Sequence, residues 1–243
     1  NVATNVVSVP FGAGGNNNLE NLNHRVESQH TFKIAKPLLL VAGYQFREGV
    51  GDSPNFSASS RSKVVSSHAG FADLQATILE RILFTGGVRQ DSYSAFGDAT
   101  TYRVTGGYLL NETGTKFRGS YATGFRAPTI NDLFFPDASN PNLKPEKSRS
   151  MDIGVDQKFL EDKLLLSGGF FWNRFQELIQ LDTAFIPQNI GNAKIQGWEY
   201  GLQYAIFKNL NFRGQYTHIL TRNLDNGNRL ARRPVDQASA GLS

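Results

Sequence analysis

Polar and apolar residues alternate along most of this chain with a period of two. In the stretch LNFRGQYT, residues 210–217, apolar or small residues occupy every second position and polar or charged residues occupy the positions between them. The same alternation runs through residues 101–110, 116–121, 151–159 and 197–206. A period of two is typical of a β-strand whose two faces meet different surroundings. Because no comparable helical period occurs, the sequence predicts an all-β protein.

About eleven strands are expected, and the connections between them alternate between short and long. Long connections gathered at one end of a set of hairpins are typical of transmembrane β-barrels. The expected strands are also longer than the five or six residues of an average strand in soluble proteins. The expected strands cover about 22–34, 37–48, 62–77, 80–92, 100–111, 115–124, 148–159, 163–177, 192–206, 209–221 and 234–243. The expected long connections are 49–61, 93–99, 125–147, 178–191 and 223–233.

The predicted fold class is an antiparallel up-and-down transmembrane β-barrel, in which each strand pairs only with the strands before and after it. Apolar faces would meet lipid and polar faces the lumen. A soluble β-sandwich binding module, with the aromatic residues in its core, is the alternative fold. The glycines expected on the lipid-facing side are Gly106, Gly119, Gly168 and Gly214. The charges expected in the lumen are Arg47, Arg89, Asp91, Arg103, Lys116, Arg118, Asp152, Asp156, Glu199 and Arg213.

Composition removes several classes of function. The chain has no cysteine, which excludes disulfides and thiolate chemistry, and its net charge of +4 comes from scattered residues. A nucleic-acid interface would need those cations clustered on one surface, so no nucleic-acid partner is expected. The four histidines (His24, His30, His68 and His218) fall on different expected strands, and each is interpreted as a lumen or interface residue. We therefore expect no metal site, no cofactor and no enzymatic activity.

One stretch interrupts the alternation. Residues 124–148, GFRAPTINDLFFPDASNPNLKPEKS, contain four prolines. Each proline fixes φ and lacks a backbone donor, so a regular ladder cannot continue through this stretch. The sequence predicts a structured loop here. Phe134 and Phe135 within it either pack beneath neighbouring loops or line a ligand vestibule.

These residues resemble a known family. The run SYATGFRAPTINDLF, followed by NPNLKPEKS and MDIGV, is similar to the barrel of TonB-dependent outer-membrane receptors. The stretches IQGWEYGLQY and RLARRPVDQASAGLS agree with it. The resemblance implies a barrel of about 22 strands with a plug domain inside. Residues 1–243 would then be one partial barrel domain, and we expect the plug to lie outside this chain.

The resemblance also implies a function. Such receptors bind a scarce nutrient, such as a ferric siderophore, cobalamin or another metal chelate, at their extracellular loops, and import it with energy from TonB. The expected partners are the TonB complex, through parts outside this chain, together with outer-membrane lipid or lipopolysaccharide and a small chelate. A passive porin-like or structural barrel is the alternative. The candidate ligand contacts are Arg126, Asp132, Phe134, Phe135, Asp137, Gln188 and Asn189.

Overall fold

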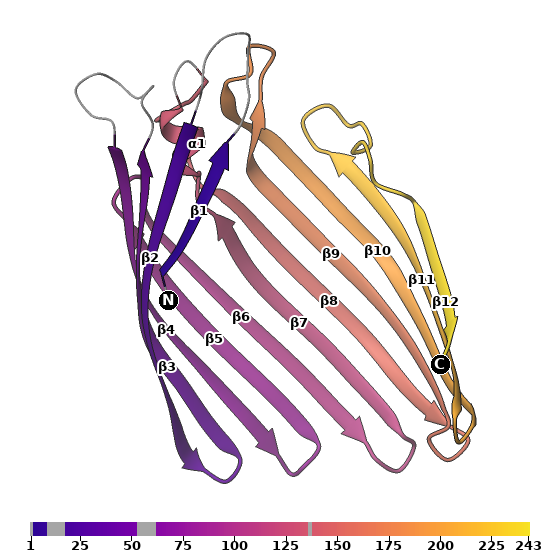
Figure 1. Ribbon diagram of the computed structural model, residues 1–243. Coiled ribbons are helices and arrows are strands. Elements are labelled where there is room, and N and C mark those ends of the chain that lie inside the picture. The colour runs from indigo at the N-terminus through magenta and orange to yellow at the C-terminus, as the bar shows by residue number, and fades with distance from the viewer. Residues whose placement is uncertain (1, 9–17, 53–61, 136–137) are drawn as a thin grey trace.

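The computed structural model describes residues 2–8, 18–52, 62–135 and 138–243. Its described part forms a single antiparallel sheet, whose twelve strands lie in the order in which they occur along the chain (Figure 1). This next-neighbour order confirms the predicted meander and, for the described residues, excludes a sandwich of two packed sheets. The strands are β1 (Val2–Ser8), β2 (Asn18–Ala35), β3 (Leu38–Asp52), β4 (Ser62–Ile78), β5 (Ile82–Tyr93), β6 (Gly97–Leu110), β7 (Thr115–Arg126), β8 (Glu146–Phe159), β9 (Leu164–Leu181), β10 (Pro187–Phe207), β11 (Leu210–Asn223) and β12 (Asp236–Leu242).

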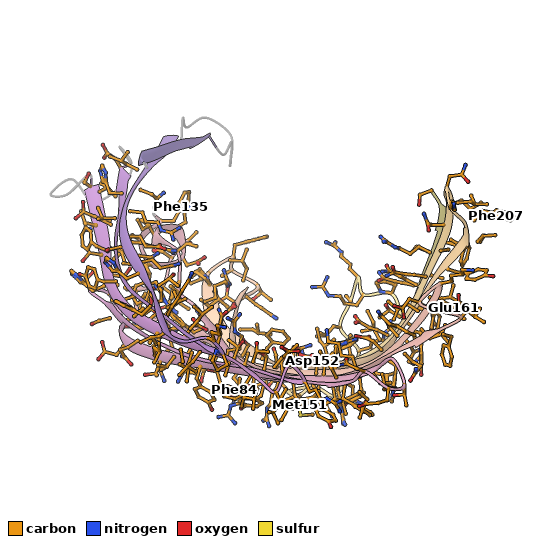
Figure 2. All side chains as sticks on the ribbon, turned by 90° about the horizontal axis from the view of Figure 1, so that it is seen from below. Phe84, Phe135, Met151, Asp152, Glu161 and Phe207 are labelled. Carbon is orange, nitrogen blue, oxygen red and sulfur yellow. The ribbon has the colours of Figure 1, made fainter. Side chains whose placement is uncertain are left out.

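The sheet curves into an arc with a concave and a convex face (Figure 2). Successive side chains of a strand point to opposite faces. Asp152 points to the concave side, whereas Met151 and Phe84 point to the convex side. Large apolar residues of the convex face, such as Ile153, stay exposed to the surroundings. The predicted assignment of faces is therefore confirmed, and the sheet is a section of barrel wall.

The glycines predicted on the convex face also agree with this arrangement. A Cβ atom added at Gly106 or Gly168 would meet no atom within 4 Å. Gly106 lies opposite Phe84 in the ladder and therefore shares its convex face. Few apolar side chains are buried. Among the described residues they are Ala69, Leu133, Leu143 and Ala193. Two of these, Leu133 and Leu143, belong to the connection between β7 and β8.

The number and length of the strands differ from the prediction in part. The twelfth strand is β1, which lies before the first expected strand. The expected long connection at 93–99 is only residues 94–96, because Tyr93 stacks on Phe96 with ring centroids 4.5 Å apart and closes a tight turn. The expected connection at 178–191 is reduced to 182–186, because the β9–β10 ladder continues through two bulges up to the pair Leu181 and Pro187.

One short helix was not expected from the sequence. Helix α1 (Ile130–Phe134) follows β7, at the end of the sheet opposite to the short hairpin turns (Figure 1). Thr129 is its N-cap, and a capping box joins Thr129 and Asp132, with each side chain accepting a hydrogen bond from the other residue's backbone N–H. Within the described residues, no helix has the length and apolar character that a membrane-spanning helix needs.

Candidate functional site

The connection between β7 and β8 folds back over the wall and is held there. We call its described residues, 127–135 and 138–145, the crossing segment. Helix α1 begins it, and the backbone N–H of Asn140 donates to the Asp132 carbonyl at 2.8 Å, which closes the segment on itself. Leu133 and Leu143 are almost fully buried. The prolines thus replace a strand pair with a compact, internally bonded structure, as predicted.

Two asparagines attach the crossing segment to the β9–β10 hairpin. The Asn189 side chain accepts from the Lys144 N–H at 2.7 Å and donates to the Lys144 carbonyl at 2.9 Å. Its amide also donates to the Glu177 carbonyl on β9 at 2.8 Å. Asn140 donates to the Pro187 carbonyl and to the Gln188 side chain, both at 3.1 Å. One side of the segment is therefore fixed by hydrogen bonds to β10, and Asn189 is itself bonded to β9.

The other side of the crossing segment reaches β3 and β4. The Lys63 ammonium of β4 lies 5.7 Å from the centre of the Phe134 ring, a distance at which a cation is attracted to an aromatic face. Helix α1 also contacts β3. Phe135 lies on the concave side of the sheet (Figure 2). The segment consequently spans from the β9–β10 hairpin to β3 and β4, at the end where the long connections lie.

Six of the seven candidate ligand contacts lie at this end, and Asp137 falls outside the described residues. Arg126 forms a bidentate ion pair with Glu146, and its Nε donates at 2.8 Å. Asp132 caps α1, and Gln188 and Asn189 hold the crossing segment. Phe134 and Phe135 are both half-buried. The structure thus gives the four polar residues intramolecular partners, and their contact with a ligand stays a prediction.

The Glu146 carboxylate of β8 also links β7 and β9. It accepts from the backbone N–H of Ile179 on β9 at 2.8 Å while pairing with Arg126 on β7. Sequence reasoning did not single out Glu146, although it lies within the quoted NPNLKPEKS stretch. Its partner Ile179 is 33 positions away in the chain, so only the fold brings the two groups together.

A polar network lines the concave face of β2 to β6. Asp91 is fully buried and forms a bidentate pair with Arg89, with both N–O distances at 2.8 Å. The Arg89 guanidinium also donates to Gln45 at 3.0 Å, and Gln45 in turn donates to Glu27. Arg89, Gln45 and Glu27 line a cleft of about 430 Å³. Charges predicted for the lumen thus pair with one another, and Gln45 and Glu27 were missed because neither stood out in the sequence.

A second network is centred on Arg118 of β7. Its guanidinium lies between Asp152 and Asp156 of β8, with N–O distances of 4.0 and 3.5 Å. A Cβ atom on Gly154, between the two acids, would lie 2.8 Å from the Arg118 Cζ, so glycine leaves the room that the guanidinium occupies. Arg103 pairs likewise with Asp73 at 3.3 Å. Neither Arg118 nor Arg103 faces the convex side, which agrees with the predicted facing of these strands.

The histidines lie apart from these networks. His68 forms a hydrogen bond with the Tyr44 hydroxyl, and its ring centroid lies 5.0 Å from that of Phe46. His218 forms a hydrogen bond with Asp236 at 2.8 Å. Within the described ranges, no three His, Cys, Asp or Glu side chains gather as a possible metal site. These histidines therefore belong to the interfaces between neighbouring strands.

The sheet is curved, its strands pair only with their neighbours, its concave face is charged, and a segment folds across it. This is the architecture of a TonB-dependent receptor barrel. Residues 3–243 match the family described as "TonB dependent receptor-like, beta-barrel", and the chain belongs to this family. Among curated proteins it is 30% identical over 209 residues to the vitamin B12 transporter BtuB of Vibrio vulnificus (strain YJ016). That match covers 82% of this chain and 32% of the relative, so the chain spans about a third of its length.

Solved structures of the same family share the fold. The siderophore receptor PirA of Acinetobacter baumannii superimposes with a TM-score of 0.77 at 16% identity, over 96% of this chain and 41% of that one. A mutant of the ferric enterobactin receptor PfeA of Pseudomonas aeruginosa gives a TM-score of 0.77 at 18% identity, over 93% and 39%. At this identity the likeness concerns the fold alone.

Proposed function

We propose that residues 1–243 form part of the barrel of an outer-membrane receptor that takes up a metal chelate with energy supplied through TonB. The family match over residues 3–243 is the observation that carries this proposal. The TonB complex would act through parts of the protein outside this chain. A ferric siderophore or cobalamin is the proposed class of ligand, since similar proteins are named as a vitamin B12 transporter and as siderophore receptors.

The proposed ligand site lies at the end of the barrel that carries the crossing segment. Arg126, Asp132, Phe134, Phe135, Asp137, Gln188 and Asn189 are its proposed contacts. The crossing segment supports this choice because it is fixed on two sides and presents half-buried aromatic side chains at the concave face. Rigid, preorganised groups lose less conformational entropy when a ligand binds.

Binding to the purified full-length receptor tests the site. A panel of cobalamin and ferric siderophores is titrated against the wild type and Phe134→Ala, with Phe207→Ala as the control. Phe207 is a similarly large aromatic residue at the far end of β10, where it is 67% exposed. We expect Phe134→Ala to weaken binding about tenfold, the scale of a truncated aromatic contact. Unchanged affinity in variants of all seven residues would remove the site assignment.

Uptake in cells tests the energy source. A strain that lacks the full-length gene should regain uptake of the chelate when the gene is restored, and should lose it again when TonB is deleted. Uptake that continues without TonB would favour the passive porin-like barrel. The absence of a plug-sized domain of about 130 residues from the full-length gene would also count against the receptor, because a barrel this wide is open without one.

A further inference from the structure

The barrel wall is open between β6 and β7 at the end that carries the long connections. Backbone pairing of these strands stops at Arg103 and Ala122, although both strands continue beyond that pair. The Thr123 hydroxyl takes over the pairing, since it accepts from the Tyr102 N–H at 2.9 Å and donates to the Tyr102 carbonyl at 3.4 Å. Beyond this point the strands separate and leave a cleft of about 560 Å³.

Side chains of the convex face line part of this cleft, together with Lys144 and Pro145 of the crossing segment. Arg149 and Lys147, which line it on β8, share the orientation of Met151 because they are two and four positions from it in a strand without bulges. Tyr102 lines its floor and stacks on Tyr121, with ring centroids 5.9 Å apart. Arg149, Lys147 and Tyr102 therefore give the cleft an outward-facing part, whereas Lys144 joins it to the crossing segment.

Arg149 is the first of four cations aligned across four strands. In the backbone ladders, Arg149 lies directly opposite Arg174 on β9. Arg174 lies opposite Lys194 on β10, and Lys194 lies opposite Arg222 on β11. All four have the convex orientation of Arg149, because residues directly opposite each other in a ladder point to the same face. Three spacings between strands make this cationic row roughly 14 Å long. The row starts at the cleft and runs away from it.

The cationic row is unfavourable without an anion. Like charges directly opposite each other on neighbouring strands repel. Among the described residues, no ion pair joins any of the four, or Lys147, to a carboxylate. The cleft itself contains Asp98 and Glu177 beside Lys144, Lys147 and Arg149, an excess of one positive charge. A ligand with several negative charges would offset this repulsion.

The next convex residues along the strands are largely apolar. Met151, Trp172 and Leu220 occupy the positions two residues from Arg149, Arg174 and Arg222 on the side of the short turns. An anionic amphiphile fits such a surface, with its charged head on the cations and its acyl chains on the apolar wall. We propose that the cleft and the cationic row bind the phosphorylated headgroup of an outer-leaflet glycolipid. This proposal rests on the proposed outer-membrane location, and it concerns the lipid rather than the imported nutrient.

The row is too long for one phosphate. A single phosphate group contacts one or two neighbouring cations, whereas the row extends roughly 14 Å beyond the cleft. A headgroup with two phosphates, such as that of lipid A, can engage Lys147 and Arg149 at the cleft together with Arg174 or Lys194 along the row. Lysine and arginine near an anionic lipid surface each strengthen binding about fivefold.

Native mass spectrometry of the purified full-length receptor in detergent tests the site. Bisphosphorylated lipid A, its monophosphoryl form and inorganic phosphate are the probes. The variants are Lys147→Gln/Arg149→Gln and Arg174→Gln/Lys194→Gln. The control is Lys36→Gln/Lys208→Gln, which removes the same charge from exposed turns at the opposite end of the barrel. We expect each test variant to weaken bisphosphorylated lipid A binding about 25-fold, and the control to leave it within twofold.

The outcomes separate the lipid site from the receptor function. Equal losses in test and control variants, or inorganic phosphate displacing the lipid at equal concentration, would overturn the site. Thermal unfolding of the lipid-free receptor checks the fold of the variants, and it should be unchanged or slightly improved because the substitutions remove repulsion. Nutrient uptake that persists in variants without lipid binding leaves the receptor function in place. Absence of the receptor from the outer membrane would instead overturn the proposed function.

Discussion

At the scale of single residues, the glycines of the concave face have different amounts of space around them. A Cβ atom at Gly197 would lie 2.1 Å from the His218 carbonyl oxygen and 2.8 Å from the Phe171 ring. At Gly201, four residues along the same strand and on the same face, the nearest atom would be the Ser167 Cβ at 3.5 Å. The first position excludes a side chain, whereas the second accepts one at ordinary contact distance.

Gly197→Ala should therefore destabilise the barrel by about 1–3 kcal/mol, the usual cost of overpacking. Backbone atoms of β11 cannot move away without breaking the ladder. The free energy of unfolding of the full-length receptor in urea and detergent measures this. Gly201→Ala is the matched control and should stay within about 1 kcal/mol of the wild type. Equal effects of the two substitutions would contradict the packing described for β10.

A carboxylate in the β9–β10 turn gives a dependence on pH. Asp182 accepts from the backbone N–H groups of Ile186 and Ala184, both at 2.9 Å. The pKa of Asp182 is lowered, chiefly by the bond from Ile186, with further contributions from Ala184 and Gln188. A lowered pKa means that the carboxylate stabilises the turn above its unfolded value of about 3.9, and that this stability is lost as the pH falls through the lower folded value.

We expect the Ile186 amide to stay protected from hydrogen exchange at pH 5 and to lose protection below about pH 4. Exchange corrected for its intrinsic pH dependence measures this. Asp182→Asn keeps an acceptor but does not titrate, so its protection should not change over the same range. A wild-type profile as flat as that of the variant would show that the carboxylate does not hold the turn.

At the scale of elements, the crossing segment depends on a few anchors more than on its own secondary structure. Helix α1 has only five residues, too short to be stable alone. Asn189 supplies three hydrogen bonds from β10, two to Lys144 in the segment and one to Glu177 on β9. The position of the segment over the wall is therefore set from outside it.

Asn189→Ala should make local opening of residues 138–145 easier by about 1–3 kcal/mol, the sum expected for its two neutral hydrogen bonds to Lys144. Hydrogen–deuterium exchange of the full-length receptor measures this, with peptides from β5 and β6 as an internal reference. Asn142→Ala is the control, because Asn142 is exposed and its side chain has no hydrogen bond among the described residues. Uniform loosening of the whole barrel would contradict a local anchor.

The sequence predicts the strands and their faces well because alternation is a local property. The capping box between Thr129 and Asp132 was also visible in the sequence, as a threonine three residues before an aspartate, and could have revealed α1. The role of Asn189 was not predictable, since its partner Lys144 lies 45 positions away. Asp73 was missed as a partner of Arg103 for the same reason.

At the scale of the whole molecule, the alternation of faces makes the wall a boundary between two environments. Phe84 and Ile153 lie on the convex face, and their neighbours Thr85 and Asp152 lie on the concave face. In a bilayer, the first pair would meet lipid and the second pair the lumen. This assignment follows from the direction in which the sheet curves.

Spin labels at these four positions test the facing. Molecular oxygen concentrates in the hydrocarbon core, so labels at 84 and 153 should collide with it several times more often than labels at 85 and 152. The measurement is power-saturation spectroscopy of the full-length receptor in bilayers, with single cysteines in a cysteine-free background. Accessibility that does not alternate between neighbouring positions would contradict the predicted barrel.

The crossing segment has one mechanical consequence for this wall. Its two sets of contacts lie on β9–β10 and on β3–β4, with four strands between them. The segment is therefore a chord across the arc that these strands form. The four strands fix the length of the arc, and the segment fixes the distance between its ends, so the radius of the arc is fixed as well. The wall can flatten or tighten at this end only if one set of contacts opens. This connection, rich in proline, therefore sets the width of the barrel at this end.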